Sequence, residues 1–279
     1  MLKFTEIKQK EFGLDNEIMN KNSRITLITV VYNSVSTIET TMLSVLNQDC
    51  GNIEYIIVDG ASTDGTLDII THYETRIKNR EFPNVDFRYI SEPDKGIYDA
   101  MNKGIAMATG EWIGIINSGD WYEDGIIRKI ADTLIERSLI QIIHGKMNVY
   151  DAEGIFFQHI ASPPSSAMLI KQIPLLHPTF FVHKNVYAAI GLFSLEYKIA
   201  SDYDFSLRCY LGGINFYCVP FVITNFCLGG CSDVQMIEGF KECKRISIEN
   251  GVGLFRSNMC FLIRIIKAKT IHPLCKLFF

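Results

Sequence analysis

Short apolar runs that end in polar residues recur along the first half of the chain. Residues 25–33 and 53–60 are rich in β-branched side chains and end in Asn33 and in Asp59-Gly60. Residues 112–116 form a third apolar run, which Asn117 ends, and a shorter run spans residues 87–90. Continuous apolar runs of this length are typical of strands that are buried on both faces. The pattern therefore predicts four parallel strands whose polar ends lie at one edge of a sheet.

Helical spacing of apolar residues follows these runs. It appears after Asn33 at Ile38, Met42, Val45 and Leu46, after Gly65 over residues 67–70, and again over residues 97–107. A strand that alternates with a helix is typical of βαβ units. We therefore expect an α/β protein with a mainly parallel, Rossmann-like sheet flanked by helices. Ligands of such sheets bind beyond the carboxyl ends of the strands, which makes that edge the expected site.

Composition narrows the class of protein. The chain has 279 residues, 48% of them hydrophobic, and a net charge of -4, which fits one large domain and gives no reason to expect nucleic acid. Its eight cysteines include no CxxC pair and no adjacent histidine for zinc, so we expect reduced thiols and a cytoplasmic protein. Residues 1–24 are charged and lack the apolar core of a signal peptide, and no stretch reaches the ~18 apolar residues of a membrane span.

Two acidic segments offer candidate chemistry. Asp120 closes the sequence Asn117-Ser118-Gly119-Asp120 beyond the fourth strand, where a cation and a diphosphate could meet. Asp202 and Asp204 lie in residues 199–205, at the start of an expected helix that runs from an N-cap at Ser201 toward residues 212–213. Without further information, both carboxylates of the second segment could simply favour the helix dipole.

Four segments in this order resemble the motifs of family 2 glycosyltransferases. They are Thr-Val-Val-Tyr-Asn at 29–33, Val-Asp-Gly-Ala-Ser-Thr-Asp-Gly-Thr at 58–66, Asp-Lys-Gly with Ala-Met-Asn-Lys-Gly within 94–104, and Asn-Ser-Gly-Asp at 117–120. The resemblance covers about residues 25–232. It implies a GT-A fold and an inverting transfer of a sugar from a nucleotide diphosphate donor, expected to be a UDP-sugar, to a glycan or lipid-linked acceptor. The last two motifs resemble the bacterial subgroup that builds cell-surface polysaccharides and lipid-linked glycans.

The resemblance also assigns roles to residues. Asp120 is expected to bind a divalent metal, Mn²⁺ or Mg²⁺, and Asp202 is expected to be the general base. Substrate contacts are expected from Thr29, Tyr32, Asn33, Asp59, Ser62, Asp94, Lys95, Asn117 and His177. The fourth motif departs from the usual family pattern, because Asn117 and Gly119 stand where further acidic residues are common. With one carboxylate left in this motif, metal binding should be weaker.

The choice between Asp202 and Asp204 rests on spacing. Arg208 lies four residues after Asp204 and is placed to form an ion pair with it on a helix, whereas Asp202 has no such partner. Asp202 also matches the family position of the base. We therefore predict that Asp202 is catalytic and that Asp204 is structural.

The chain is expected to divide into an N-terminal extension (1–24), a catalytic domain (25–252) and a basic, apolar tail (253–279). The nucleotide-binding lobe would reach about residue 150, and a loop at 161–166 would precede the acceptor lobe. The tail either meets a membrane surface, placing the protein at the inner face of the plasma membrane, or packs on the domain or on a second subunit of a homodimer. Residues 229–232 resemble a family loop near the end of the catalytic core.

Other functions remain open from the sequence. A sugar-phosphate nucleotidyltransferase would share the α/β sheet and the metal, but it usually carries an early glycine-rich phosphate loop, which is absent after residues 29–33. A sugar-nucleotide-binding protein without transfer activity fits the reduced acidic cluster at 117–120. An assay of donor hydrolysis separates these classes.

Overall fold

The computed structural model describes residues 23–137, 139–151, 154, 156–159, 163–172, 175–229 and 235–270. Within them, one sheet has the strand order β3-β2-β1-β4-β8-β6-β9-β5, and β7 pairs with β6. The first half is parallel: β1 pairs with both β2 and β4, and β2 pairs with β3. These strands are β1 (Ile25–Val31), β2 (Ile53–Asp59), β3 (Val85–Ser91) and β4 (Trp112–Asn117).

The second half of the sheet is mixed. β8 is antiparallel to β4 and β6, β9 is parallel to β6, and β5 and β7 are antiparallel to β9 and β6. Its strands are β5 (Trp121–Tyr122), β6 (Ile142–Tyr150), β7 (Phe156–His159), β8 (Phe181–His183) and β9 (Phe216–Cys227). The four predicted parallel strands and the α/β class are therefore confirmed, and a mixed extension is added to them.

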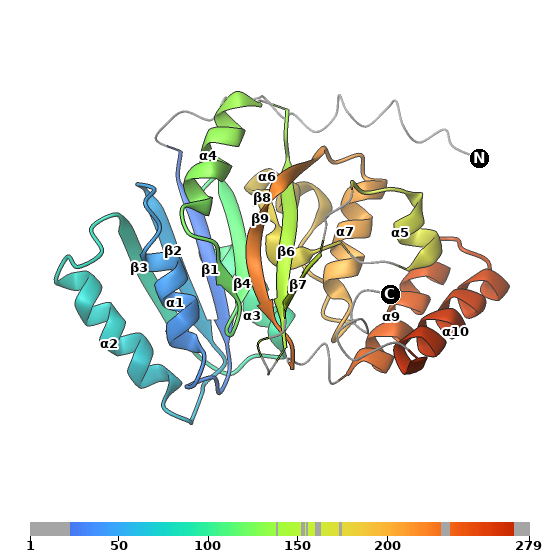
Figure 1. The fold of residues 1–279 in the computed structure, drawn as a ribbon, viewed down its shortest axis with the longest axis horizontal. Coiled ribbons are helices and arrows are strands. Elements are labelled where there is room, and N and C mark those ends of the chain that lie inside the picture. Colours follow the sequence, from blue (N-terminus) through green and yellow to red (C-terminus); the bar gives the residue numbers. More distant parts are fainter. Residues whose placement is uncertain are drawn as a thin grey trace.

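Helices cover both faces of the sheet (Figure 1). The helices are α1 (Ile38–Leu46), α2 (Thr66–Lys78), α3 (Ile97–Met107), α4 (Ile126–Glu136), α5 (Ser166–Lys171), α6 (Lys184–Ile190), α7 (Ser201–Leu211), α9 (Met236–Glu249), α10 (Leu254–Thr270) and a 3-10 turn, η1 (His177–Thr179). One core cluster joins α1, α2 and α4, and another joins α3, α6 and α7. Strand β1 contributes Leu27 and Val31 to the first cluster and Ile28 and Val30 to the second, because successive strand residues face opposite sides.

Helices α5, α9 and α10 gather at one end of the molecule, opposite α2 and β3 (Figure 1). A third apolar cluster, which includes Tyr203 of α7 and Cys243 and Ile246 of α9, attaches this end to the sheet domain. No helix in the described residues combines the length and the apolar character that crossing a bilayer requires.

The predicted N-cap of α7 was wrong by one residue. Ser201 is the first helical residue, and Ala200 holds the cap position. The hydroxyl of Ser201 donates to the Ser194 carbonyl at 2.8 Å instead of capping the helix. In the loop expected at 161–166, Ser165 caps α5 through the amide of Ala167, while residues 161 and 162 lie outside the described part of the chain.

Candidate active site

Polar side chains fasten together the loops that follow β1 and β2. The amide of Asn33 donates to Ser62 Oγ at 2.8 Å, and the amide of Thr63 donates to Asn33 Oδ1 at 2.8 Å. Asn33 and Ala61 both have positive φ, +46° and +61°, which asparagine tolerates better than most residues. Because the two loops share these bonds, Asn33 and Ser62 fix the shape of the sheet edge where a ligand is expected.

Asp59 supports this edge from beneath. It is fully buried, and its carboxylate accepts hydrogen bonds from the Ser62 amide and from Ser91 Oγ, the latter at 2.6 Å. The Ser62 hydroxyl donates to the same carboxylate. With its oxygens occupied by serine donors, Asp59 orients the loop, and a direct contact with a nucleotide would require these bonds to exchange.

Tyr32, Gly60 and Asp94 lie side by side at the same edge. A Cβ atom built on Gly60 would stand 2.6 Å from Asp94 Oδ2 and 3.3 Å from Tyr32 Cδ2, so a side chain at this position would require Asp94 to move. The Tyr32 side chain is 63% exposed, which is unusual for a large ring that follows a buried strand. Asp94 accepts the Gly96 amide through Oδ1 at 2.8 Å, and Lys95 is exposed. An exposed ring beside a carboxylate is suited to a nucleobase and its ribose.

Thr29, which the family resemblance assigns to substrate contact, lies inside the sheet. Thr29 is fully buried within β1, on the sheet face that Leu27 and Val31 share. Its hydroxyl lies 3.0 Å from the hydroxyl of Tyr55 on β2. Thr29 stands two residues before the strand end, so the sheet covers it and leaves only the later residues of the motif at the edge.

Asp120 stands beyond the end of β4 and is 3% exposed. Thr41 of α1 holds its turn: the Thr41 hydroxyl donates to the Asp120 carbonyl at 2.7 Å and accepts the Gly119 amide at 3.0 Å. The Asp120 carboxylate accepts the Cys227 amide at 3.1 Å. Burial raises the pKa of Asp120 to about 8, against the opposing effect of its hydrogen bonds with Cys227 and Asn117. The carboxylate is thus buried with few donors to stabilise its charge.

A divalent cation fits the residues around Asp120. The Oδ1 atom of Asn117 is buried and has no hydrogen-bond partner in the described part of the chain, so an oxygen ligand is left available next to the carboxylate. Among the described residues, no group of three or more His, Cys, Asp or Glu side chains could hold a metal ion, so a cation here would need ligands of other kinds as well. One carboxylate and one amide oxygen suit Mg²⁺ or Mn²⁺ that keeps several waters and binds substrate phosphates.

Asp202 lies in the first turn of α7 and is partly buried. Its Oδ1 accepts the Tyr203 amide at 2.8 Å and lies 3.1 Å from the hydroxyl of Tyr98, which also donates to the Ile199 carbonyl at 2.6 Å. Burial raises the pKa of Asp202 to about 6, although the hydrogen bonds from Tyr203 and Tyr98 lower it. No hydrogen bond among the described residues reaches Oδ2, so that oxygen is available to take a proton.

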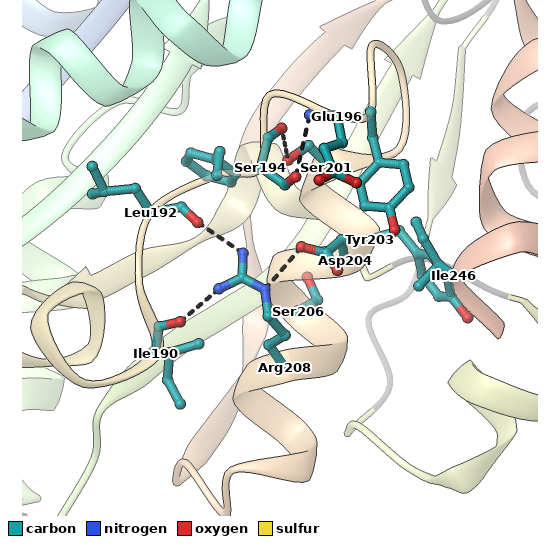
Figure 2. A network of polar contacts seen from close by, with 12 residues as sticks. Ile190, Leu192, Ser194, Glu196, Ser201, Tyr203, Asp204, Ser206, Arg208 and Ile246 are labelled. Carbon is teal, nitrogen blue, oxygen red and sulfur yellow. Dashed lines mark hydrogen bonds and ion pairs between the residues drawn. The ribbon is translucent and has the colours of Figure 1, made fainter. Parts of the chain in front are cut away.

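Asp204 has a different role in the same helix (Figure 2). Its Oδ2 accepts Arg208 Nε at 2.8 Å, and the other two nitrogens of the guanidinium donate to the carbonyls of Ile190 and Leu192 at 2.7 and 2.8 Å. Asp204 is 8% exposed. Arg208 therefore ties α7 to the end of α6 and to the segment that follows it, and Asp204 completes the set of acceptors for its charge. The predicted Asp204–Arg208 ion pair is confirmed.

Glu242 of α9 is a residue that sequence reasoning missed. Its carboxylate accepts the amides of Lys198, Ile199 and Ala200 at 2.9, 2.9 and 2.8 Å. Ala200 holds the cap position of α7 and the other two residues precede it, so Glu242 fixes the segment that leads into the helix carrying Asp202. Its partners are backbone groups, which leave no pattern in the sequence.

His177 begins η1 and is 5% exposed. Its ring packs against Phe180 and Phe193, with centroids at 5.6 and 5.3 Å, and Phe193 in turn packs against Tyr98 at 5.6 Å. Burial lowers the pKa of His177 to about 4, so the ring is neutral at physiological pH. His177 therefore belongs to the aromatic cluster beneath Tyr98 and Asp202 rather than to the exposed loops.

The chain is similar to known sequences over more than half of its length. The profile of glycosyl transferase family 2 matches residues 26–188. The chain belongs to this family. A PGL/p-HBAD biosynthesis glycosyltransferase of Mycobacterium tuberculosis is 30% identical over 170 residues, which cover 60% of this chain and 62% of that protein. The putative glycosyltransferase EpsH of Bacillus subtilis is 38% identical over 109 residues, 39% of this chain and 30% of that protein. The chain thus spans less than two thirds of the length of these curated relatives.

Solved structures agree on the fold. S. aureus TarS in complex with UDP is similar over 89% of this chain and 75% of that one, with a TM-score of 0.60 and 18% identity. The mannosyltransferase PcManGT from Pyrobaculum calidifontis, in complex with GDP-Man and Mn²⁺, is similar over 90% of this chain and 76% of that one, with a TM-score of 0.63 and 16% identity. The expected family and the expected GT-A fold are confirmed. The family match ends before α7, so it does not reach Asp202, and residues 230–232 of the expected late loop lie outside the described residues.

Proposed function

We propose that this protein transfers a sugar, with inversion, from a nucleoside diphosphate donor to a hydroxyl group of a glycan or lipid-linked acceptor in cell-surface glycan biosynthesis. Family membership supports the reaction class. The observation on which the proposal rests is that two carboxylates, Asp120 and Asp202, are buried or partly buried and receive few hydrogen bonds. Groups in this condition are suited to ligand binding or proton transfer. The cytoplasmic location expected from the cysteines is part of the same proposal.

The donor site is proposed at the edge formed by Tyr32, Asp94 and Asp120. The exposed Tyr32 ring offers a face for stacking the base, with Asp94 beside it. Thr37 Oγ1 lies 3.3 Å from Ser118 Oγ, which joins the loop after β1 to the segment that ends at Asp120. A base bound at Tyr32 would therefore direct its diphosphate toward Asp120. Solved relatives bind UDP-GlcNAc or GDP-Man, and we propose UDP as the nucleotide of this donor.

Asp120 and Asn117 Oδ1 would hold a divalent cation, which would offset the charge that develops on the leaving diphosphate. Asp202 Oδ2 would accept the proton of the attacking acceptor hydroxyl. A single displacement with one base inverts the anomeric carbon, because no covalent sugar–enzyme intermediate forms. The pKa of about 6 leaves Asp202 ionised at neutral pH while keeping it a stronger base than an exposed aspartate.

The test has two steps. Thermal shift with UDP, GDP and a panel of their sugars, with and without Mn²⁺ or Mg²⁺, should single out a uridine nucleotide whose effect grows with metal. Release of the nucleoside diphosphate from the chosen sugar donor should then require the protein and increase with acceptor. Release of pyrophosphate from UTP and a sugar phosphate would instead indicate a nucleotidyltransferase, and donor binding without release of the diphosphate would indicate a binding protein.

A further inference from the structure

Helix α10 (Leu254–Thr270) is attached to the domain by one face. Cys260 Sγ donates to the Lys171 carbonyl of α5 at 3.1 Å, and Lys244 Nζ of α9 lies 4.7 Å from the centre of the Phe261 ring. Both contacts join α10 to the helices that neighbour it at this end of the molecule (Figure 1). The helix is therefore a fixed part of the structure rather than a free extension.

The inward face of α10 carries a buried arginine. Arg264 is 7% exposed, its guanidinium carbon lies 4.0 Å from the centre of the Phe240 ring, and it donates to the carbonyl of Gln172. Ser257 and Ala268 are buried on the same face. A surface helix normally turns its apolar side chains inward and its charges outward.

The outward face of α10 is apolar. Five large side chains separated by helical intervals of three, four and one residues are exposed, and we call them the outer stripe: Phe255 (81%), Met259 (44%), Leu262 (50%), Ile263 (48%) and Ile266 (51%). At 100° per residue they fall within about 100° of one another, opposite Arg264. The helix thus exposes a continuous apolar stripe while it buries an arginine, which indicates that the outer stripe meets an apolar environment.

Positive charge borders the outer stripe. Arg256 and Lys267 are exposed on one side of it, and Lys171 is exposed where α5 meets Cys260. The helix has no acidic residue anywhere between Leu254 and Thr270. Apolar side chains bordered by arginine and lysine are typical of helices that lie in the interface of an anionic bilayer.

A second copy of the chain fits this surface less well. In a two-fold interface each residue faces its counterpart or the residue equally far from the axis. Antiparallel pairing of two outer stripes would bring Arg256 of one copy toward Lys267 of the other. That arrangement places like charges together, whereas an anionic surface complements them.

We propose that the outer stripe and its basic border form a docking surface for the anionic lipid headgroups and outer acyl chains of a membrane. Helix α10 then lies flat in the interface, with Arg264 and α9 on the protein side. This surface does not depend on the sugar-transfer reaction, although it would hold the active site near lipid-linked acceptors.

Co-sedimentation of the full chain with vesicles tests the proposal. The protein should bind mixed phosphatidylglycerol–phosphatidylcholine vesicles, bind pure phosphatidylcholine roughly tenfold more weakly, and lose affinity as salt rises. Combined Phe255→Gln, Leu262→Gln and Ile266→Gln should lower the partition coefficient by about tenfold or more. Combined Arg256→Gln and Lys267→Gln should lower it by roughly tenfold for anionic vesicles alone.

Leu139→Gln is the matched control, since Leu139 lies before β6, away from α10, and is 63% exposed. This variant should bind vesicles as the unaltered chain does. If the triple variant fails to fold, the single variant Phe255→Gln tests the proposal instead. It should fold, because a side chain that is 81% exposed has little packing to lose. Unaltered binding in a folded stripe variant, or equal binding to neutral and anionic vesicles, would overturn the proposal. A dimer in solution that the stripe substitutions separate, without vesicle binding, would assign the surface to a second copy.

Discussion

Two buried carboxylates lie at opposite ends of the parallel strands, and they differ in how their charge is satisfied. Glu54, at the amino end of β2, accepts Thr26 Oγ1 at 2.5 Å, Thr109 N and Oγ1 at 2.7 and 2.8 Å, and a bond from Arg88. Burial raises its pKa, but these donors together lower it to about 2. Asp120, beyond the carboxyl end of β4, has few donors, and burial raises its pKa to about 8.

The same contrast recurs within α7. Asp204 is satisfied by Arg208, which is itself held by two backbone carbonyls, whereas one oxygen of Asp202 receives no hydrogen bond among the described residues. A buried charge without enough donors costs stability, so it persists where a ligand or a proton completes it. From this comparison we infer that Glu54 and Asp204 stabilise the fold, and that Asp120 and Asp202 are available for ligand binding and proton transfer.

The largest expected effect is on transfer in Asp202→Asn. Removal of the proposed base should lower the rate by ~10² to 10⁴ with little change in donor affinity or melting temperature. In the unaltered protein, kcat/KM should fall as the pH drops below about 6, because Asp202 becomes protonated. Rates measured from pH 5 to 8 provide the check. Full activity in the variant would place the base elsewhere.

Glu54→Gln should lower stability and leave transfer unchanged, which is the opposite of the effect expected for Asp202→Asn. It removes a carboxylate that four side-chain and backbone groups stabilise, so the free energy of unfolding should fall by about 3 kcal/mol while transfer per folded molecule stays unchanged. Urea unfolding alongside rate measurements at a temperature where the variant is folded decides this. A Glu54→Gln variant as stable as the unaltered protein would contradict the structural role of Glu54.

The pH dependence of the free energy of unfolding also tests the structural role of Glu54. The pKa of Glu54 is about 2 in the folded protein and 4.5 for an ordinary glutamate, so its contribution is present above 4.5 and is lost as the pH falls toward 2. The contribution amounts to about 3 kcal/mol. Acidification should therefore destabilise the unaltered protein more than Glu54→Gln.

Asp204→Asn should have the smallest effect. It leaves the Arg208 guanidinium, which is partly buried, without its carboxylate and should cost about 1–2 kcal/mol of stability, with transfer retained. Comparison of its melting temperature and rate with those of Asp202→Asn tests the division of roles in α7. A catalytically dead Asp204→Asn variant of normal stability would reverse the assignment.

The sequence predicted the parallel half of the sheet, because its strands are short apolar runs separated by regular helices. It did not predict β5 and β8, which have two and three residues and gain their pairing only from the neighbouring strands. Arg208 was found from i,i+4 spacing, which is local. Glu242 and the Thr29–Tyr55 contact were not found, because each joins segments that only tertiary packing brings together.

The central claim is that Asp120 is buried with few donors because a metal and a nucleoside diphosphate complete its site. Calorimetric titration of UDP into the unaltered protein and into Asp120→Asn, each with and without Mn²⁺, tests it most directly, with Glu54→Gln as the control. The account predicts that Mn²⁺ strengthens UDP binding in the unaltered protein and in the control. In Asp120→Asn, binding should weaken by about tenfold or more and lose its metal dependence, without a fall in melting temperature. Metal-dependent binding of unchanged affinity in Asp120→Asn would contradict the account.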